Sequence, residues 1–442
     1  MTVDYIPFTE LLSDIIDNRG RTCPTSNTGI PLIATNCIRN DLLYPVFENI
    51  RYVSKETIET WFRGHPKPGD IIFVNKGTPG RVCMVPDPVR FCIAQDMVAI
   101  RADQKKIYPK YLFAVLRSSE IQTQIENMHV GTLIPHFKKG DFDKLLVPVP
   151  DRKTQEIIGN NYFTLSNKIE LNRRMNETLE AMARAIFKSW FVDFDPVRAK
   201  AEGKKPAGMD AETAALFPSE FETVDGREVP KGWRVVKLGE LSSLDKGVSY
   251  KGDFLSDEGI SMINLGCFTG EGKFSIDNLK FYSGEYRERH VVKPGDIVLA
   301  NTDITQKREV LGSPAIVPPF SQFNRSIFTH HVYAIRFKKE FETLNYVVYF
   351  SLLNPDFRER AIGFATGTTV LALPRDTLLE YSLVIPDEKI IQQFNNAIKP
   401  LFSLIYNNIE QSSTLAQLRD ALLPKLMSGE IILNSPPKIS GL

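Results

Sequence analysis

The chain has 442 residues, of which 43% are hydrophobic and 24% are charged, and its formal net charge is +1. This length predicts two or more domains of ordinary globular composition, and the balanced charge excludes a surface that is basic as a whole. Five cysteines without a CxxC pair, no signal-peptide pattern and no run of about 18 apolar residues predict a soluble, cytoplasmic protein with reduced thiols.

Residues 1–150 are predicted to form a module of mixed short strands and helices. Asp70-Ile71-Ile72-Phe73-Val74 and the segment from Phe91 to Arg101 have the apolar content of buried strands bounded by Gly and Pro. The segment from Tyr108 to Met128 is typical of a helix, and Leu145 to Val149 is typical of a short strand.

The same order of segments returns in the second half of the chain. Gly29-Ile30-Pro31-Leu32-Ile33 corresponds to Gly259-Ile260-Ser261-Met262-Ile263, and Lys67-Pro68-Gly69-Asp70-Ile71 corresponds to Lys293-Pro294-Gly295-Asp296-Ile297. Repeat units of solenoid proteins are about 20 to 50 residues long, far shorter than this spacing. The sequence therefore predicts a duplicated domain, with the second copy at residues 231–386.

A long helix is predicted after each module, at residues 151–196 and 387–433. Asp151 and Asp387 follow prolines and are suited to cap these helices. Apolar residues recur in alternating steps of three and four, which is the pattern of a coiled-coil seam. The predicted seam or subunit-docking positions are Ile158, Tyr162, Leu165, Ile169, Leu179, Met182, Ile186, Trp190, Phe394, Leu401, Ile405, Leu415, Leu418 and Leu422.

Two like units in tandem favour a pseudo-two-fold arrangement, so we expect the long helices to pack as an antiparallel coiled coil. The alternative is two unrelated surface helices, each on its own domain. Pro400 is expected to kink the second helix or delay its start. Asn172 and Asn408 either fix the register of the seam or mark a wet gap. Residues 197–230 are predicted to be a linker and residues 434–442 a frayed tail.

Signals for catalysis are weak throughout the sequence. Asn354-Pro355-Asp356-Phe357 faintly resembles an amino-methyltransferase motif, but it departs at its third position, and we interpret it as a helix break. Residues 270–274 lack the spacing and the Ser/Thr of a phosphate-binding loop. The histidines, including His330-His331, lack metal-ligand spacing, and His136 is interpreted as structural.

The duplicated order strongly resembles the specificity (S) subunits of type I restriction–modification systems. In the first half the resemblance is carried by Gly131-Thr132-Leu133-Ile134-Pro135-His136-Phe137 and Leu145-Leu146-Val147-Pro148-Val149-Pro150. In the second half it is carried by Gly367-Thr368-Thr369-Val370 and Leu383-Val384-Ile385-Pro386. Phe187 to Pro196 is similar to the end of the central region of such subunits.

The resemblance implies an α+β fold with two target-recognition domains separated by two long helices. It implies a non-catalytic subunit that reads a bipartite, asymmetric site in double-stranded DNA. Its partners would be two methyltransferase (M) subunits, which carry S-adenosylmethionine, and restriction (R) subunits, which use ATP and magnesium. No cofactor or metal is expected on this chain. A rod of about 55 Å between the readers would leave the middle of the site unread.

The predicted DNA-binding residues are basic, amide and hydroxyl side chains on loops, because such groups contact phosphates and base edges. They are Arg19, Arg21, Lys76, Thr78, Arg81, Lys138 and Lys139 in the first module, and Lys246, Lys251, Asn301, Thr302, Lys307, Arg308 and Arg325 in the second. Each of them is equally consistent with ordinary solvated surface charge.

Two other classes of protein remain open from the sequence. One is a coiled-coil adaptor that clamps proteins without touching DNA. The other is a stand-alone DNA methyltransferase or nuclease, which the missing cofactor loop disfavours.

Overall fold

The computed structural model of the chain describes residues 3–18, 22–128, 134–270, 272, 274–276, 278–305 and 308–431. It divides into two compact units, and the boundaries fall inside the two long helices. Unit 1 comprises Met1–Met175 with Asn408–Leu442, and unit 2 comprises Asn176–Asn407. Each compact unit therefore contains one globular module and half of each long helix.

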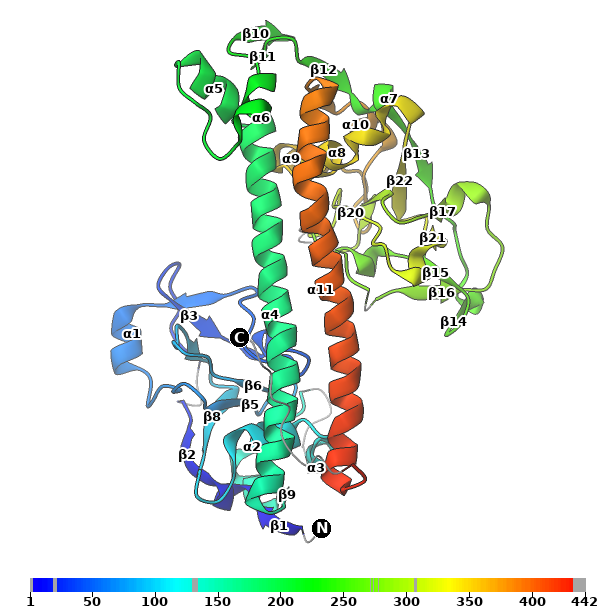
Figure 1. Cartoon of the computed structure of the whole chain (residues 1–442). Helices are drawn as coiled ribbons and strands as arrows, with labels where there is room; N and C mark the ends of the chain where they lie inside the picture. Colours follow the sequence, from blue (N-terminus) through cyan, green and yellow to red (C-terminus); the bar gives the residue numbers. More distant parts are fainter. Residues whose placement is uncertain are drawn as a thin grey trace. The chain divides into compact units, whose positions relative to one another are not determined.

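Unit 1 contains nine strands and three short helices in its described residues (Figure 1). The strands are β1 (Asp4–Pro7), β2 (Leu12–Ile16), β3 (Ile30–Ile33), β4 (Arg51–Val53), β5 (Ile71–Val74), β6 (Val82–Met84), β7 (Cys92–Ile93), β8 (Met97–Ala102) and β9 (Leu146–Val149). The short helices are α1 (Lys55–Thr60), α2 (Pro109–Leu116) and α3 (Ser119–Met128). The single helix predicted from Tyr108 to Met128 is thus two helices.

The strands of unit 1 form a four-stranded sheet in the order β2-β8-β5-β6, a three-stranded sheet in the order β4-β3-β7, and the pair β1-β9. The four-stranded sheet is antiparallel throughout, with Ile72 of β5 opposite Ala99 of β8. Every residue of β5 is buried, as its uninterrupted apolar run predicts. Phe8, Phe73, Phe137 and Phe142 cluster in the core beside this sheet.

Unit 2 repeats this topology with additional short strands. Its strands are β12 (Arg234–Lys237), β13 (Ser242–Lys246), β14 (Leu255–Ser256), β15 (Ile260–Ile263), β16 (Lys280–Tyr282), β17 (Val291–Val292), β18 (Ile297–Ala300), β19 (Thr302–Asp303), β20 (Pro314–Ile316), β21 (Ser326–Phe328), β22 (Val332–Phe337), β23 (Leu371–Ala372) and β24 (Ser382–Ile385). Its short helices are α7 (Leu238–Leu241), α8 (Asn345–Leu352), α9 (Pro355–Gly363) and α10 (Arg375–Leu379).

The sheet orders of the two units correspond strand by strand. The order β13-β22-β18-β20 matches β2-β8-β5-β6, and the pair β12-β24 matches β1-β9. The registers also agree, because Arg234 pairs with Ile385 as Asp4 pairs with Val149. The predicted duplication and the α+β fold class are confirmed.

The two long helices are α4 (Arg152–Phe191) and α11 (Glu388–Ser428). Asp151 caps α4 as predicted, because its carboxylate accepts a hydrogen bond of 3.1 Å from the backbone N–H of Thr154. The prediction that Pro400 delays the start of the second helix is wrong, since α11 begins at Glu388 and continues through it.

Within each unit the helix halves run antiparallel. In unit 2, the Asn176 amide donates to the Ile405 carbonyl over 3.3 Å, and Phe191, further along α4, lies 4.8 Å from Phe394, earlier on α11. In unit 1, Asn172 is fully buried and donates to Gln411 Oε1 over 2.9 Å and to Ser412 Oγ over 3.2 Å. These contacts support the interpretation that Asn172 fixes the register of the seam.

The seam differs from the predicted heptad at two positions. Met182 and Leu418 are 48% and 46% exposed, whereas Ala183 and Arg419, one residue later on each helix, are buried. The seam on α4 steps by four residues from Leu179 to Ala183, as the 3.6-residue period of a straight helix favours. The other predicted positions are buried or half-buried as expected.

The segment predicted to be a linker carries regular structure. It contains α5 (Asp195–Ala201), α6 (Ala211–Leu216) and the hairpin of β10 (Phe221–Val224) and β11 (Arg227–Pro230). Three aromatic residues in and beside this segment enter the core of unit 2, and these are Phe194, Phe217 and Trp233. In the described part of the chain, no helix is long and apolar enough to cross a membrane.

Candidate nucleic-acid interface

The duplicated Lys-Pro-Gly-Asp motif is structural in both units. In unit 1, Asp70 accepts a hydrogen bond of 2.7 Å from the backbone N–H of Lys67 and two of 2.8 Å from Arg101. In unit 2, Asp296 accepts from the N–H of Lys293 over 3.1 Å and from Arg336 over 3.0 Å. In each unit the aspartate ties the turn before one central strand to an arginine on the neighbouring strand. This motif therefore positions the strand and the loop that follows the strand.

The loop after β5 brings two predicted groups of residues together in unit 1. The backbone N–H of Phe137 donates to the Asn75 carbonyl over 2.9 Å, and the Asn75 amide donates back to the Phe137 carbonyl over 3.0 Å. The N–H of Gly77 also donates to the Pro135 carbonyl over 2.9 Å. These bonds hold the segment beginning at Lys76 beside the segment that carries Lys138 and Lys139.

Exposed cations gather around this junction. Lys76, Arg81, Lys138 and Lys139 are all exposed, and Thr78 is half-buried. The Lys139 ammonium lies 2.7 Å from the Asp17 carboxylate, and Arg63, which sequence reasoning missed, lies 3.9 Å from the same carboxylate. We call Arg63, Lys76, Lys138 and Lys139 the unit 1 loop patch. Its members come from three separate segments of chain, which explains why no run of basic residues predicts it.

The corresponding strand end in unit 2 is built differently. Asn301 and Thr302 are buried, contrary to the surface position that base reading requires. The Asn301 carbonyl accepts from the N–H of Leu373 over 2.7 Å, as the Asn75 carbonyl does from Phe137. The Thr302 hydroxyl is hydrogen-bonded to His331 Nδ1 over 2.8 Å. Asn301 and Thr302 therefore stabilise the fold. The sequence spacing that aligns Asp70 with Asp296 in the repeat also aligns Asn75 with Asn301.

The other predicted residues of unit 2 remain on the surface where the structure describes them. Lys246, Lys251, Arg308 and Arg325 are exposed. The Arg325 guanidinium is paired with the Glu288 carboxylate over 2.7 Å, and the carbonyl of Arg308 accepts a bond of 2.7 Å from Arg358. Arg19, Arg21 and Lys307 lie outside the described residues, as do Gly131, Thr132 and Leu133.

A pair of histidines, which the sequence analysis considered only as a possible metal site, lies beside Lys246. The rings of His330 and His331 lie 3.8 Å apart, and His331 is half-buried. Burial lowers the pKa of both rings, and the positive charge of Lys246 lowers each further. Adjacent histidines on a turn do not have the ligand spacing of a metal site, so the sequence pattern gives the pair no role.

The weak catalytic signals have structural roles. Asn354 caps α9 by accepting a hydrogen bond of 3.1 Å from the N–H of Asp356, and Phe357 is fully buried, so the helix-break interpretation is confirmed. All five cysteines are buried, and burial raises the pKa of their thiols, to about 12 for Cys92 and about 11 for Cys267. Among the described residues, no cluster of three or more His, Cys, Asp or Glu has the geometry of a metal site.

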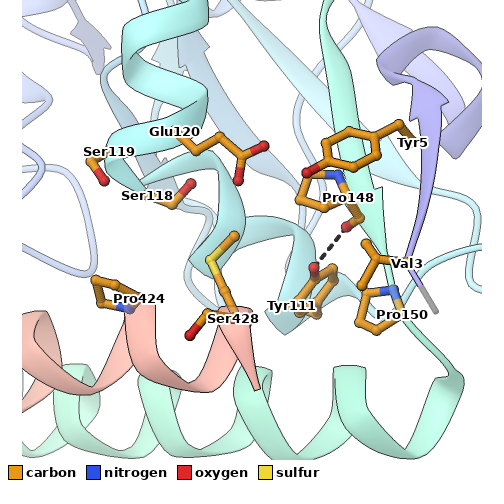
Figure 2. A pocket seen from close by; sticks show the side chains of 11 residues that line it. Val3, Tyr5, Tyr111, Ser118, Ser119, Glu120, Pro148, Pro150, Pro424 and Ser428 are labelled. Carbon is orange, nitrogen blue, oxygen red and sulfur yellow. Dashed lines mark hydrogen bonds between the residues drawn. The ribbon is translucent and has the colours of Figure 1, made fainter. Parts of the chain in front are cut away.

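A pocket of about 330 Å³ opens in unit 1 beside the end of α11 (Figure 2). Its walls are formed by Val3, Tyr5, Tyr111, Ser118, Ser119, Glu120, Pro148, Pro150, Pro424, Met427 and Ser428. The Tyr111 hydroxyl donates to the Pro148 carbonyl over 2.7 Å, and the negative charge of Glu120 raises the pKa of Tyr5.

The repeat explains why this pocket exists in unit 1. The strand register that aligns β1 with β12 places Val3 at the position of Trp233, and the helix alignment places Met427 at the position of Phe191. In unit 2 the Phe191 and Trp233 rings lie 5.9 Å apart in the core. Smaller side chains thus leave space in unit 1 that aromatic rings fill in unit 2.

Comparison with known proteins agrees with this architecture. Residues 12–181 match the type I restriction modification DNA specificity domain. The HindI specificity subunit of Haemophilus influenzae, a type I restriction enzyme subunit, is 27% identical over 83% of this chain and 87% of its own length. The MjaIX specificity subunit of Methanocaldococcus jannaschii is 23% identical over 91% of this chain and 87% of its own length.

The fold is also found in a solved structure. The crystal structure of a type I restriction–modification S subunit from M. genitalium is similar, with a TM-score of 0.57, 16% identity and 96% of each chain covered. The match to the specificity domain spans the globular module of unit 1 and most of α4. Over most of its length the chain is similar to type I restriction enzyme specificity subunits.

Proposed function

We propose that this protein is the DNA-recognition subunit of a type I restriction–modification complex, in which each unit reads one half of a bipartite site in double-stranded DNA. The observation that carries this proposal is the duplicated fold. In both units, an aspartate and arginine pair holds the turn before the central strand, and each unit carries exposed cations on its loops. In unit 1 this surface is the loop patch.

The two units differ in the side chains at these surfaces, which supports an asymmetric target. Unit 1 presents four cations from three segments, while unit 2 presents Lys246 beside two histidines. Phosphate contacts from such cations position a protein on the duplex, and neighbouring loop side chains then reach base edges. Different side chains at equivalent places are what two different half-sites require.

We further propose that the long helices bind two methyltransferase subunits, and that restriction subunits join that complex. Large apolar side chains exposed along both helices support this, and they are Leu171, Met175 and Met182 of α4 and Leu404 and Leu418 of α11. Contiguous patches of exposed apolar surface mark protein contacts, whereas single exposed residues do not. In this proposal S-adenosylmethionine is bound by the methyltransferase subunits, and ATP and magnesium by the restriction subunits. This chain itself contributes recognition and no catalytic residue.

Methylation mapping of genomic DNA tests the proposal, with and without the gene for this chain. We expect one bipartite methylated motif to disappear on deletion and to return on complementation. A complementing gene with Lys138→Ala and Lys139→Ala should restore it less completely. An unchanged set of methylated motifs would instead favour the adaptor alternative. S-adenosylmethionine binding by the purified chain would favour the stand-alone methyltransferase.

A further inference from the structure

The histidine pair of unit 2 occupies a turn that neighbouring strands hold in place. His330 and His331 lie between β21 and β22. The backbone N–H of His330 donates to the Val248 carbonyl, and that of Thr329 donates to the Ile263 carbonyl, both over 2.9 Å. The two rings are 3.8 Å apart, with an angle of 42° between their planes. These bonds fix the backbone of the turn, and the bond between Thr302 and His331 Nδ1 fixes the second ring.

The charged groups facing the pair are positive. Lys246 is close enough to lower the pKa of both rings, after burial and, for His331, the neighbouring ring. The Tyr250 ring lies 6.5 Å from His330, and the Lys280 ammonium lies 5.7 Å above the Tyr250 ring. Thr302, on β19, is bonded to His331.

The carboxylate on β19 is not available to balance these charges. Asp303 is fully buried, and its oxygens accept hydrogen bonds from the backbone N–H groups of Thr305, Val310 and Leu311 over 2.6, 2.7 and 3.1 Å. Within the described residues, no carboxylate is among the charges that shift the pKa of either histidine. The cluster is consequently suited to an anion.

We propose that His330, His331 and Lys246 form a contact site for a backbone phosphate of DNA in the half-site read by unit 2. This inference rests on the proposed function and adds a specific ligand contact to it. Lys246 supplies a permanent charge, and the histidines supply a charge that forms when the phosphate binds. The Nδ1 atom of His331 is already bonded to Thr302, so Nε2 is the atom of that ring left to donate to a phosphate. Protonation makes such a hydrogen bond charge-assisted and therefore stronger.

The contact predicts a pH dependence whose sign follows from the pKa shifts. In the free protein the lowered pKa keeps both rings neutral near pH 7. A bound phosphate raises the pKa, because a negative charge favours the protonated form. The histidine pKa is thus higher in the DNA complex than in the free protein. DNA affinity should therefore rise as pH falls between these two pKa values, and it should become constant below the lower one. Repulsion between the adjacent rings limits the uptake to about one proton.

Unit 1 lacks this device. The backbone N–H of Asn301 donates to the His331 carbonyl, and the equivalent N–H of Asn75 donates to the Asp96 carbonyl, both over 2.9 Å. This correspondence places Gln95 and Asp96 where unit 2 has His330 and His331. Neither an amide nor a carboxylate gains positive charge near neutral pH. The histidine-dependent effect should accordingly belong to unit 2 alone.

The test measures DNA binding by the full chain as a function of pH. The probe is a fluorescent random-sequence duplex of about 40 base pairs at low salt, since phosphate contacts act on any sequence. The wild type is compared with the double variant His330→Asn, His331→Asn between about pH 5.5 and about 8.5. His65→Asn is the control, because His65 is a histidine of unit 1. Circular dichroism checks the fold of each variant.

We expect wild-type affinity to rise by up to about tenfold per pH unit as pH falls, the limit for one proton. The double variant should lose most of this slope, and His65→Asn should keep it. Calorimetry of the wild type in buffers of different ionisation enthalpy should show that protons are taken up when DNA binds. This measurement tests the inference even if the double variant misfolds. Equal slopes in wild type and a folded double variant, or no proton uptake, would overturn the inference and leave DNA recognition intact. No DNA binding by the wild type at any pH would overturn both.

Discussion

Arg101 donates two hydrogen bonds of 2.8 Å to the two carboxylate oxygens of Asp70. This fork joins β8 to the turn before β5, and the same two residue types are bonded in unit 2, where Arg336 donates to Asp296. Bidentate pairs such as that of Arg101 fix orientation as well as distance. In both units, an aspartate and arginine pair therefore fixes the position of the strand that leads to the candidate interface.

Replacing Asp70 with Asn should destabilise unit 1. Asp70 is nearly fully buried, so its loss leaves the Arg101 charge with the exposed Asp14 as its remaining partner. We expect the free energy of unfolding to fall by about 2–4 kcal/mol, somewhat less than the ~3–5 kcal/mol of a fully buried pair, because the Arg101 side chain is 29% exposed. Hydrogen exchange of the β5 and β8 amides measures the loss in unit 1.

Asp14→Asn is the matched control for this substitution. Asp14 bonds the same guanidinium over 3.1 Å but is half exposed, so its loss should cost at most about 1 kcal/mol. If both substitutions accelerate hydrogen exchange of the β5 and β8 amides equally, the bidentate pair of Asp70 and Arg101 is not what stabilises the sheet.

The unit 1 loop patch should contribute to DNA affinity through phosphate contacts. Substituting Lys138 and Lys139 with Ala should weaken binding to every sequence and lower the slope of log affinity against log salt by about 0.9 for each phosphate that is no longer neutralised. Titrations of a labelled duplex at several salt concentrations provide the measurement. Lys204→Ala is the control, since Lys204 is an exposed lysine in the segment between the modules. An unchanged slope in the double variant would make Lys138 and Lys139 ordinary surface charges.

The aromatic cluster of unit 2 should be more sensitive to truncation than its counterpart in unit 1. Trp233 is buried against Phe191 at 5.9 Å and Phe194 at 5.7 Å. Trp233→Ala should lower the free energy of unfolding by about 3–5 kcal/mol through the cavity that it leaves. Val3→Ala, at the equivalent position beside the pocket, should cost about 1 kcal/mol or less. Urea unfolding of the two variants compares these values, and similar losses would show that the pocket of unit 1 is not a packing difference.

The large features of the fold could be predicted because they depend on patterns that the sequence repeats. The cap at Asp151, the buried strand before Asn75 and the strand ending at Val149 follow from local chemistry. The exact seam could not be predicted, because steps of three or four residues are both compatible with one apolar stripe. Arg419 shows the difficulty: it is buried with its guanidinium 5.4 Å from the Tyr162 ring, at the position where α4 has Ala183.

The candidate interface was predicted less well than the fold. Residue type and loop position correctly put Lys76, Lys138 and Lys246 on the surface, but they could not show that Thr302 bonds to His331. That bond depends on two segments distant in the sequence meeting in the fold. Arg63 was missed for the same reason, since only the fold brings it to Asp17.

The exchange of one module tests the central claim, two independent readers on one chain, most directly. Residues 1–150 are replaced by the corresponding module of a similar specificity subunit, and the methylated motif is mapped in cells that contain the proposed partner subunits. We expect one half of the bipartite motif to change to that of the donor while the other half stays the same. A folded chimera that altered both halves, or neither, would contradict it.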